Sequence, residues 1–354
     1  MDIKFIKREE LQEKPDQKKL GFGKYFADYM FTMDYDEGIG WHDATIRPYG
    51  PIEMNPATVV LHYAQETFEG LKAYRRADGQ IQLFRPEMNA RRMINSNKRL
   101  CMATIPEDMF IEAVNALVKA EEDWVPSEPE TSLYIRPFAF ACESSLGVHK
   151  SKAYKFVIIL SPVGAYYAEG LAPVKIMVED EYVRAVQGGT GFTKCGGNYA
   201  GSIIGQVKAE KYGCSQVLWL DGRERKYVEE VGAMNIMFKI DGEIYTAPIE
   251  GTVLPGVTRD SIIHILKDWG YKVNETHLSV DDLMQAGRDG RLEEVYGTGT
   301  AAVISPVGAL VYKGEEITIN NFKIGDLTQK LYDYLTGIQW GKEEDKYGWT
   351  RLVK

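Results

Sequence analysis

Short apolar runs of strand length recur along the chain, and several are separated by Asp-Gly, a dipeptide typical of tight hairpin turns. Three of these pairs predict hairpins over residues 74–84, 216–231 and 235–246. Because a hairpin pairs its two strands antiparallel, the pattern predicts antiparallel or mixed sheets. It does not fit a doubly wound sheet of parallel strands.

Segments with the period of an amphipathic helix lie between these strand-like runs. The predicted helices cover residues 86–102, 107–122, 199–212, 258–267 and 326–335. In the third of them, one apolar face is formed by Ala200, Ile203, Ile204 and Val207. Gly213 then ends this helix. Helices mixed with hairpins predict an α+β fold.

The length of the chain indicates two domains, since 354 residues exceed what one hydrophobic core usually holds. Residues 162–173 are rich in proline, glycine and alanine, and they separate two strand-like runs. We therefore predict a smaller N-terminal α/β domain over residues 1–164 and an interdomain loop over 165–173. A larger C-terminal domain over 174–354 then carries Lys194.

Charge and composition exclude several classes of protein. A net charge of −9 argues against binding to nucleic acid or to an anionic membrane, because both need a basic face. No apolar run is long enough to span a bilayer or to form the core of a signal peptide. The four cysteines lack CxxC spacing and the five histidines lack HExxH spacing. These patterns predict free thiols in a reducing cytoplasm and no metal site.

Lys194 lies within residues 188–199, where five glycines surround it. Glycine permits positive φ and lets a ligand come close to the backbone. Because a predicted helix follows at once, the lysine lies on a tight loop that leads into that helix. A lysine amine in such a loop forms a Schiff base when a dry pocket lowers its pKa. The alternative is an ordinary solvated lysine.

Other segments carry groups that bind anions or a cofactor ring. Glu229 and Glu230 end a predicted strand, and strand alternation turns only one of them inward. Residues 256–258 open a predicted helix and present free amide groups at its N-terminus. Residues 297–300 form a Gly-Thr turn of the kind that binds anions. Taken singly, these motifs favour simpler interpretations: both glutamates as solvated edge charges, a capped helix with Thr258 as its N-cap, and a flexible surface turn.

The helix that starts at Pro86 adds arginines at positions 91, 92 and 99. An inward arginine binds a phosphate in bidentate fashion, although an exposed basic face is expected for at least two of the three. A Schiff-base lysine, an inward carboxylate, an arginine and two amide-rich turns are together what pyridoxal phosphate needs. The carboxylate keeps the ring nitrogen protonated, so that the ring accepts electrons.

The same motifs resemble those of branched-chain amino-acid aminotransferases, which are pyridoxal-phosphate enzymes of fold type IV. The most specific pieces lie at residues 68–74, 83–86, 134–137, 194–199, 230–235 and 254–257. The resemblance extends from Trp41 to the Gly-Thr-Ala turn at 299–301, nearly the whole chain. It implies a two-domain α+β fold with antiparallel or mixed sheets in both domains. It also implies reversible transfer of an amino group between leucine, isoleucine or valine and 2-oxoglutarate.

The resemblance assigns roles to individual residues. Lys194 is implied as Schiff-base lysine and proton shuttle, Glu230 as the contact of the pyridine nitrogen, and Tyr199 as the contact of the ring hydroxyl. The implied phosphate ligands are Arg92, Val257, Thr258 and Thr300. The implied aromatic substrate pocket comprises Phe26, Tyr63, Phe68, Tyr134 and Tyr166.

The same resemblance implies binding sites for the side-chain carboxylate of glutamate and for the α-carboxylate of the substrate. Arg136, beside Tyr134, receives the side-chain carboxylate of glutamate, and backbone amides near Thr300 and Ala301 take the α-carboxylate. Residues 145–148 reach the site of a partner subunit, which implies a homodimer.

Two positions depart from relatives of this family. Ala302 and Ser305 stand where some animal relatives carry a redox CxxC, and Ala233 stands where many carry threonine. The close alternatives are a D-amino-acid aminotransferase or an aminodeoxychorismate lyase, which are shorter and lack the Tyr-Ile-Arg-Pro and Trp-His-Asp-Ala pieces. A non-catalytic protein that binds a nucleotide or phosphate ligand is disfavoured, because the glycine loop lacks the Gly-Lys-Ser/Thr ending of a P-loop.

Overall fold

The computed structural model describes residues 1–164 and 171–354. The chain forms two compact units. The first unit comprises Met1–Ala168, Thr193–Gly196 and Gly337–Lys354, and the second comprises Glu169–Phe192 and Gly197–Thr336. Most of the predicted interdomain loop 165–173 lies outside the described residues. These units are not the two continuous domains predicted from the sequence. Lys194 and residues 337–354 lie in the first unit, although both fall within the predicted C-terminal domain.

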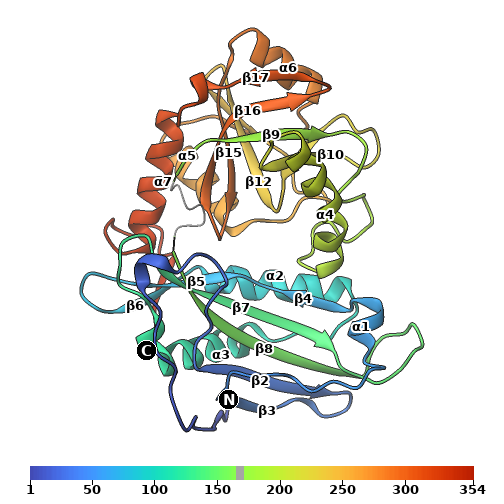
Figure 1. Ribbon diagram of the computed structural model, residues 1–354, viewed down its shortest axis with the longest axis vertical. Coiled ribbons are helices and arrows are strands. Elements are labelled where there is room, and N and C mark those ends of the chain that lie inside the picture. Colours follow the sequence, from blue (N-terminus) through green and yellow to red (C-terminus); the bar gives the residue numbers. More distant parts are fainter. Residues whose placement is uncertain (165–170) are drawn as a thin grey trace. The chain divides into compact units, whose positions relative to one another are not determined.

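The first unit is built on a nine-stranded sheet (Figure 1). Along the sheet the strand order is β1-β3-β2-β8-β7-β5-β6-β18, and β4 pairs with β7. All pairs are antiparallel except β1 with β3. The strands are β1 (Lys4–Phe5), β2 (Tyr29–Asp36), β3 (Gly40–Pro48), β4 (Glu66–Phe68), β5 (Leu71–Arg75), β6 (Ile81–Phe84), β7 (Ser132–Ala141), β8 (Ala153–Val163) and β18 (Thr350–Leu352).

Three α-helices accompany this sheet: α1 (Val59–Tyr63), α2 (Pro86–Arg99) and α3 (Glu107–Ala120). The apolar stripe of α3, which includes Phe110 and Leu117, packs into the core with Leu133 and Ile135 of β7. Because side chains alternate along a strand, Tyr134 and Arg136 lie on the opposite face of β7. One face of the central strands thus fills the core and the other remains for a site.

The second unit is a nine-stranded mixed sheet that closes on itself. The order β11-β10-β9-β16-β15-β12 is completed by a β11–β12 pairing, with β13 and β14 beyond β12 and β17 beside β16. The strands are β9 (Val174–Glu179), β10 (Gln216–Leu220), β11 (Val228–Val231), β12 (Met234–Ile240), β13 (Glu243–Thr246), β14 (Val273–Glu275), β15 (Leu292–Gly299), β16 (Val303–Tyr312) and β17 (Glu315–Thr318). The β11–β12 pairing covers the edges that these two strands would otherwise expose, while β14 and β17 remain terminal strands of the sheet.

Four α-helices lie in the described residues from 171 onward: α4 (Gly196–Lys211), α5 (Val257–Asp268), α6 (Val280–Arg288) and α7 (Asp326–Gln339). The three predicted hairpins are confirmed as the antiparallel pairs β5–β6, β10–β11 and β12–β13. The five predicted helices correspond to α2, α3, α4, α5 and α7. Helix α6 was not predicted, although Ser279 caps it by accepting a hydrogen bond from the amide of Asp282.

The apolar face of α4 is exposed. Ile203 is 61% exposed, and Ile204 and Val207 are also exposed, whereas Gly205 and Ala209 are buried. A Cβ on Gly205 would lie 2.5 Å from the Trp219 side chain, so the indole packs directly against the helix backbone at this glycine. The close approach of Trp219 therefore decides which face of the helix is buried.

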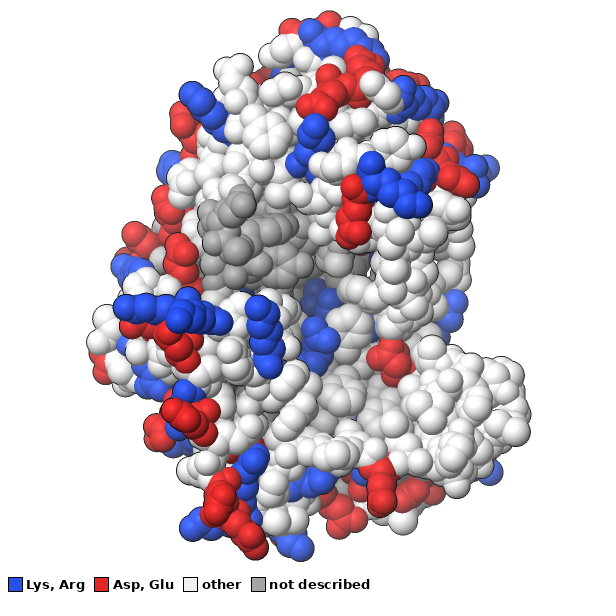
Figure 2. All heavy atoms as spheres, in the orientation of Figure 1, with Lys and Arg blue, Asp and Glu red and all other residues white. Residues whose placement is uncertain are grey.

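Charged side chains are mixed over the visible surface of both units. Figure 2 shows acidic and basic residues interspersed, without a continuous basic field on the face in view. This mixture is in keeping with the net charge of −9. In the part of the chain that the structure describes, no helix has both the length and the apolar character needed to cross a membrane.

Candidate functional site

Lys194 is held by its own backbone against the first unit. Its amide donates a hydrogen bond to Ser96 Oγ on α2 over 3.0 Å, and its carbonyl accepts one from the amide of Phe68 over 2.9 Å. The side chain is half-buried, and Nζ lies 4.7 Å from the centre of the Phe68 ring. The loop that carries the lysine is thus fixed to β4 and α2.

Several glycines around Lys194 are required by the packing and backbone conformation of the protein itself. A Cβ on Gly191 would lie 2.5 Å from the carbonyl oxygen of Thr252, and one on Gly196 would clash with the Glu66 side chain. Gly188 adopts a φ of +81°, which disfavours other residues. Close approach and positive φ, which the sequence predicted for this loop, are therefore both present.

Arg92 is the one inward arginine of α2. It is buried, whereas Arg91 and Arg99 are exposed, as expected for at least two of the three. The Arg92 guanidinium meets Glu69 in bidentate fashion, with Nε 2.7 Å from Oε1 and Nη2 2.8 Å from Oε2. Asn89 Nδ2 also donates to Glu69 Oε2 over 2.8 Å. Glu69 is fully buried, so the arginine is held by a desolvated carboxylate.

Aromatic and basic side chains gather on one face of β7 and β4. Arg136 Nη2 donates to Tyr134 Oη over 2.9 Å, and the guanidinium carbon lies 4.7 Å from the centre of the Phe68 ring. Lys194 Nζ lies over the same ring. The structure therefore brings together four residues that the sequence had singled out: Phe68, Tyr134, Arg136 and Lys194.

Lys72 on β5 is a neighbour of this group that the sequence analysis did not single out. It is directly opposite Tyr134 in the β5–β7 pairing, so both side chains lie on the same face of the sheet. Burial lowers the pKa of Lys72 to about 7. Gly70 leaves the space that Tyr134 Oη occupies, because a Cβ there would overlap the phenol oxygen.

The other predicted pocket aromatics have local partners in the first unit. Phe26 stacks on Tyr49 with ring centres 5.0 Å apart. Tyr63, at the end of α1, is 40% exposed and donates a hydrogen bond to the carbonyl of Leu146 in the predicted partner-reaching loop. Tyr166 lies outside the described residues.

The second unit holds the predicted carboxylate in a small cavity. Arg184, Tyr199 and Glu230 all line this cavity, together with Ala233 and Leu254. Glu230 is buried; its Oε2 lies 2.9 Å from Arg184 Nε, and its Oε1 accepts hydrogen bonds from Asn235 Nδ2 and the Leu254 amide. The Glu230 carboxylate, which lines the same cavity as Tyr199, is thus fixed by Arg184 and two hydrogen bonds.

Sequence reasoning missed Arg184 and misjudged Glu229. Arg184 lies in an irregular segment without periodicity, and only the tertiary fold carries it to Glu230. The expectation that one of the two glutamates faces solvent is wrong, since both are buried. They point to different cavities: Glu230 lines the one with Tyr199, and Glu229 lines another.

The two predicted phosphate turns both lie near Asn235 of β12. Helix α5 begins at Val257 after Gly256, and Val257 and Thr258 are buried in its first turn. A Cβ on Gly256 would overlap the Asn235 side chain, whose Nδ2 also donates to the carbonyl of Leu254. Asn235 pairs across the sheet with Thr298 of β15, the strand that leads to Thr300 and Ala301.

The described residues contain no cluster of three or more His, Cys, Asp and Glu side chains suited to a metal ion. Taken by itself, the first unit holds Lys194 and the buried Arg92, and the second unit holds the buried Glu230 and two amide-rich turns. An arginine and amide-rich turns are groups that bind phosphate, and a buried carboxylate is a group that binds a basic ring nitrogen.

Comparison with known proteins shows the family to which the chain belongs. Residues 66–310 match the family model for amino-transferase class IV. The chain is 55% identical over 352 residues to a probable branched-chain-amino-acid aminotransferase of Staphylococcus aureus (strain N315), covering 99% of this chain and 98% of that protein. It is also 55% identical over 340 residues to branched-chain-amino-acid aminotransferase 2 of Bacillus subtilis (strain 168), covering 96% and 94%.

Solved structures show the same fold. The Escherichia coli branched-chain amino acid aminotransferase is 27% identical, with a TM-score of 0.76 over 92% of this chain and 99% of that one. The T.th enzyme is 27% identical in its complex with pyridoxamine 5'-phosphate (TM-score 0.74, covering 91% and 98%) and in its complex with N-(5'-phosphopyridoxyl)-L-glutamate (TM-score 0.73, covering 91% and 98%). The chain therefore belongs to the class IV aminotransferases, and among them to the branched-chain-amino-acid aminotransferases.

Proposed function

We propose that this chain uses pyridoxal phosphate to transfer an amino group reversibly between leucine, isoleucine or valine and 2-oxoglutarate. Family membership supports the reaction, and the cofactor derivatives in the two T.th structures support the cofactor. The observation that carries the proposal is the buried Glu230, which is ion-paired to Arg184 and lines one cavity with Tyr199.

The side chains of each unit fit this cofactor. When bound, pyridoxal phosphate supplies an electron sink for the charge that develops at the substrate α-carbon. Lys194 would hold the cofactor covalently and then, as a free amine, move the proton at that carbon. Glu230, supported by Arg184, would keep the ring nitrogen protonated, and Tyr199 would bind the ring hydroxyl. Val257, Thr258, Thr300 and Arg92 would bind the phosphate.

The face around Phe68 suits two kinds of substrate side chain. A branched aliphatic chain packs against aromatic rings, whereas the second carboxylate of glutamate needs a cation. Arg136 supplies that cation, and its Nε is buried without a hydrogen-bond partner among the described residues. The resemblance adds Phe26, Tyr63 and Tyr166 to the wall of this pocket, and amides near Thr300 and Ala301 to bind the α-carboxylate.

A homodimer in the cytoplasm completes the proposal. Leu146 and Val148 are exposed apolar residues, 66% and 82% accessible, in the loop predicted to reach a partner. The free thiols of Cys101, Cys142, Cys195 and Cys214 suit a reducing compartment.

A panel of amino donors with 2-oxoglutarate tests the reaction. We expect glutamate to form with leucine, isoleucine and valine, and the absorption of the bound cofactor to change on addition of each. The D-enantiomers serve as the matched control. Turnover of D-amino acids without turnover of the L-forms would favour the alternative of a D-amino-acid aminotransferase and would contradict the proposal.

A further inference from the structure

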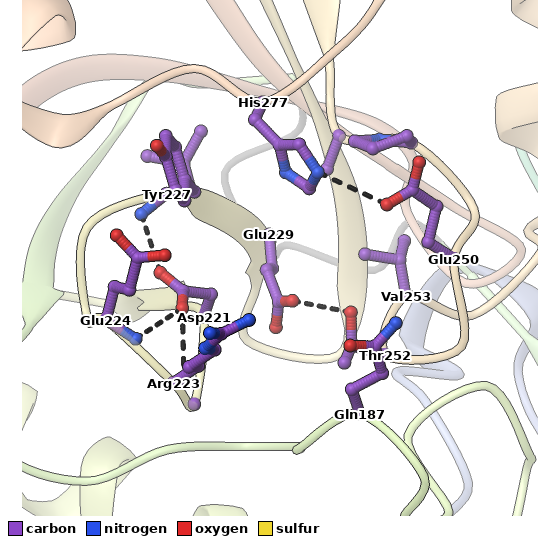
Figure 3. A pocket seen from close by; sticks show the side chains of 14 residues that line it. Gln187, Asp221, Arg223, Glu224, Tyr227, Glu229, Glu250, Thr252, Val253 and His277 are labelled. Carbon is purple, nitrogen blue, oxygen red and sulfur yellow. Dashed lines mark hydrogen bonds and ion pairs between the residues drawn. The ribbon is translucent and has the colours of Figure 1, made fainter.

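A second cavity in the second unit plays no part in the proposed reaction. It has a volume of about 170 Å³ and is formed by the β10–β11 turn, the end of β13 and residues 247–253, with His277 at its rim. Figure 3 shows Glu229 between Asp221 and Thr252 in this cavity. Since a cavity of about 150 Å³ holds a molecule as large as benzene, the space accepts a small organic ligand.

Glu229 has an unused hydrogen-bond acceptor here. The residue is only 7% exposed, and its Oε1 accepts a hydrogen bond from Thr252 Oγ1. Its Oε2 is buried and has no hydrogen-bond partner among the described residues. A buried carboxylate oxygen without a donor is costly, so Glu229 keeps an unsatisfied acceptor in the lining of this cavity.

Of the other carboxylates that line the cavity, Asp221 and Glu250 already have partners, and Glu224 is exposed to solvent. Asp221 accepts hydrogen bonds from the backbone amides of residues 223, 224, 226 and 227, which hold its pKa below the ordinary value even though burial opposes this. Glu250 Oε2 lies 3.2 Å from His277 Nε2. The described lining therefore offers one free buried carboxylate oxygen, that of Glu229.

The charges around Glu229 favour a cation. Burial raises the pKa of Glu229; the Thr252 hydroxyl and Arg184 oppose that rise, while Glu230 and Asp221 add to it. A positively charged donor against Oε2 would replace the lost hydration and offset these two like charges. Ca²⁺ takes six to eight oxygen ligands and Mg²⁺ an octahedral set, which one free carboxylate oxygen does not provide. An ammonium group needs at most three acceptors.

We propose that this cavity binds a small molecule through a primary ammonium group, with Glu229 Oε2 as the charged acceptor. Amino acids and simple amines share this chemistry. Arg223 lies at the rim, where a guanidinium would distinguish the two by binding a carboxylate. The site goes beyond the proposed transamination and is separate from the cavity that Glu230 and Tyr199 line.

The new site is connected to Glu230 by polar contacts. Glu229 accepts from the Thr252 hydroxyl, the Thr252 carbonyl accepts from Arg184, and Arg184 is ion-paired to Glu230. A ligand that draws Glu229 toward the cavity would change the first of these contacts, the hydrogen bond between Thr252 and Glu229. The contacts supply a physical route from the cavity to the carboxylate proposed for the cofactor ring.

The test uses holoenzyme that has been reduced with borohydride, so that the cofactor no longer reacts with amines. Isobutylamine is the probe, and isobutanol is the matched molecule without the ammonium group. Ligand-observed NMR titration gives both dissociation constants. We expect saturable binding of isobutylamine and none of isobutanol. Equal binding of the two would mean that the ammonium group is not recognised, and binding of neither would mean that the cavity holds only water; both results contradict the proposal.

Variants locate the binding. Glu229→Gln keeps the shape of the side chain and removes its charge, and we expect it to weaken isobutylamine binding roughly ten- to a hundred-fold. Glu224→Gln, an equal change of charge at an exposed rim position, should weaken it less than about threefold. Unchanged affinity in Glu229→Gln would overturn the assignment. The comparison of isobutylamine with isobutanol on the unmutated chain stands even if a variant does not fold.

A titration with valine distinguishes a site for amino acids from a site for simple amines. Tighter binding of valine than of isobutylamine, lost in Arg223→Gln, supports an amino-acid site, and equal binding supports a simple-amine site. Binding of valine with no binding of isobutylamine would contradict an ammonium site. Because the cofactor is blocked, failure here leaves the transamination proposal unaffected, and absence of transaminase activity leaves this binding result unaffected.

Discussion

At the scale of single residues, two neighbouring arginines of α2 lie in opposite environments. Arg91 pairs with Glu107 at the surface, and Arg92 pairs with Glu69 in the interior. The sequence places both on one helix but does not say which is buried, because that depends on the orientation of α2. The environments nevertheless predict very different energies for the two pairs.

Removal of each carboxylate measures this difference. Glu69→Ala removes the bidentate carboxylate partner of the buried Arg92 charge, so we expect it to lower the free energy of unfolding by about 3–5 kcal/mol. Glu107→Ala removes an exposed partner and should cost less than about 1 kcal/mol. Urea denaturation of the cofactor-free protein gives both values. Similar losses for the two variants would mean that the Arg92 environment is solvated.

Arg136 is predicted to decide between the two classes of substrate. A charge-assisted hydrogen bond contributes about 1.5–3 kcal/mol, so Arg136→Met should lower kcat/KM for glutamate roughly ten- to a hundred-fold. Leucine should lose little, since its side chain contacts aromatic rings. Half-reaction kinetics with each amino acid separately provide the measurement. Equal losses would mean that Arg136 acts structurally or binds the α-carboxylate.

A buried acid predicts a pH dependence of stability. Burial, with Asp28 nearby, raises the pKa of Glu121 to about 8, although the Tyr29 amide donates to the Glu121 side chain. The unfolded chain then loses its proton at lower pH than the folded one, so stability falls as pH rises from about 4.5 to about 8. Glu121→Gln resembles the protonated form.

We therefore expect Glu121→Gln to stabilise the protein by about 1–3 kcal/mol at pH 9 and to have no effect near pH 4.5. Denaturation curves at the two pH values make the comparison. A destabilisation at both pH values would show that the charged carboxylate is needed for the Tyr29 contact.

At the scale of elements, α4 offers a matched pair of glycines. Gly205→Ala puts a Cβ 2.5 Å from the Trp219 side chain, and the resulting overpacking should cost about 1–3 kcal/mol. Gly201→Ala meets nothing within 4 Å and should stabilise the helix by about 0.5–1 kcal/mol. Thermal unfolding of both variants tests the orientation of the helix. Equal effects would contradict the packing of Trp219 against α4.

The elements themselves were largely predictable, but their orientation was not. Asp-Gly turns and helical periodicity are local signals, and they located the three hairpins and five of the helices. The buried face of α4 was not predictable, because its exposed face is the apolar one and the contact at Gly205 comes from Trp219 on the next strand, β10, which helical periodicity does not reveal. Arg184 was missed for the same reason, since its pairing with Glu230 exists only after folding.

At the scale of the whole molecule, segments distant in sequence build each unit. The first unit includes residues 193–196 and 337–354, which follow part or all of the second unit in the sequence. The loop that carries Lys194 is therefore part of the same unit as β4 and α2, and Lys194 is hydrogen-bonded to Ser96 of α2. Length and linker composition predicted two domains. No sequence pattern predicted that residues 193–196 and 337–354 would join the first unit, because that assignment depends on contacts between segments distant in the sequence. The motifs around Lys194 were nevertheless visible, because glycine and charged residues mark them in the sequence.

The central claim is that Lys194 carries the cofactor and the chemistry. Borohydride reduction of the yellow holoenzyme, followed by peptide mapping, tests it most directly. The account predicts a single phosphopyridoxyl group on the peptide that contains Lys194, and no group and no transamination in a folded Lys194→Ala variant. A group on any other lysine, or transamination that survives Lys194→Ala, would contradict it.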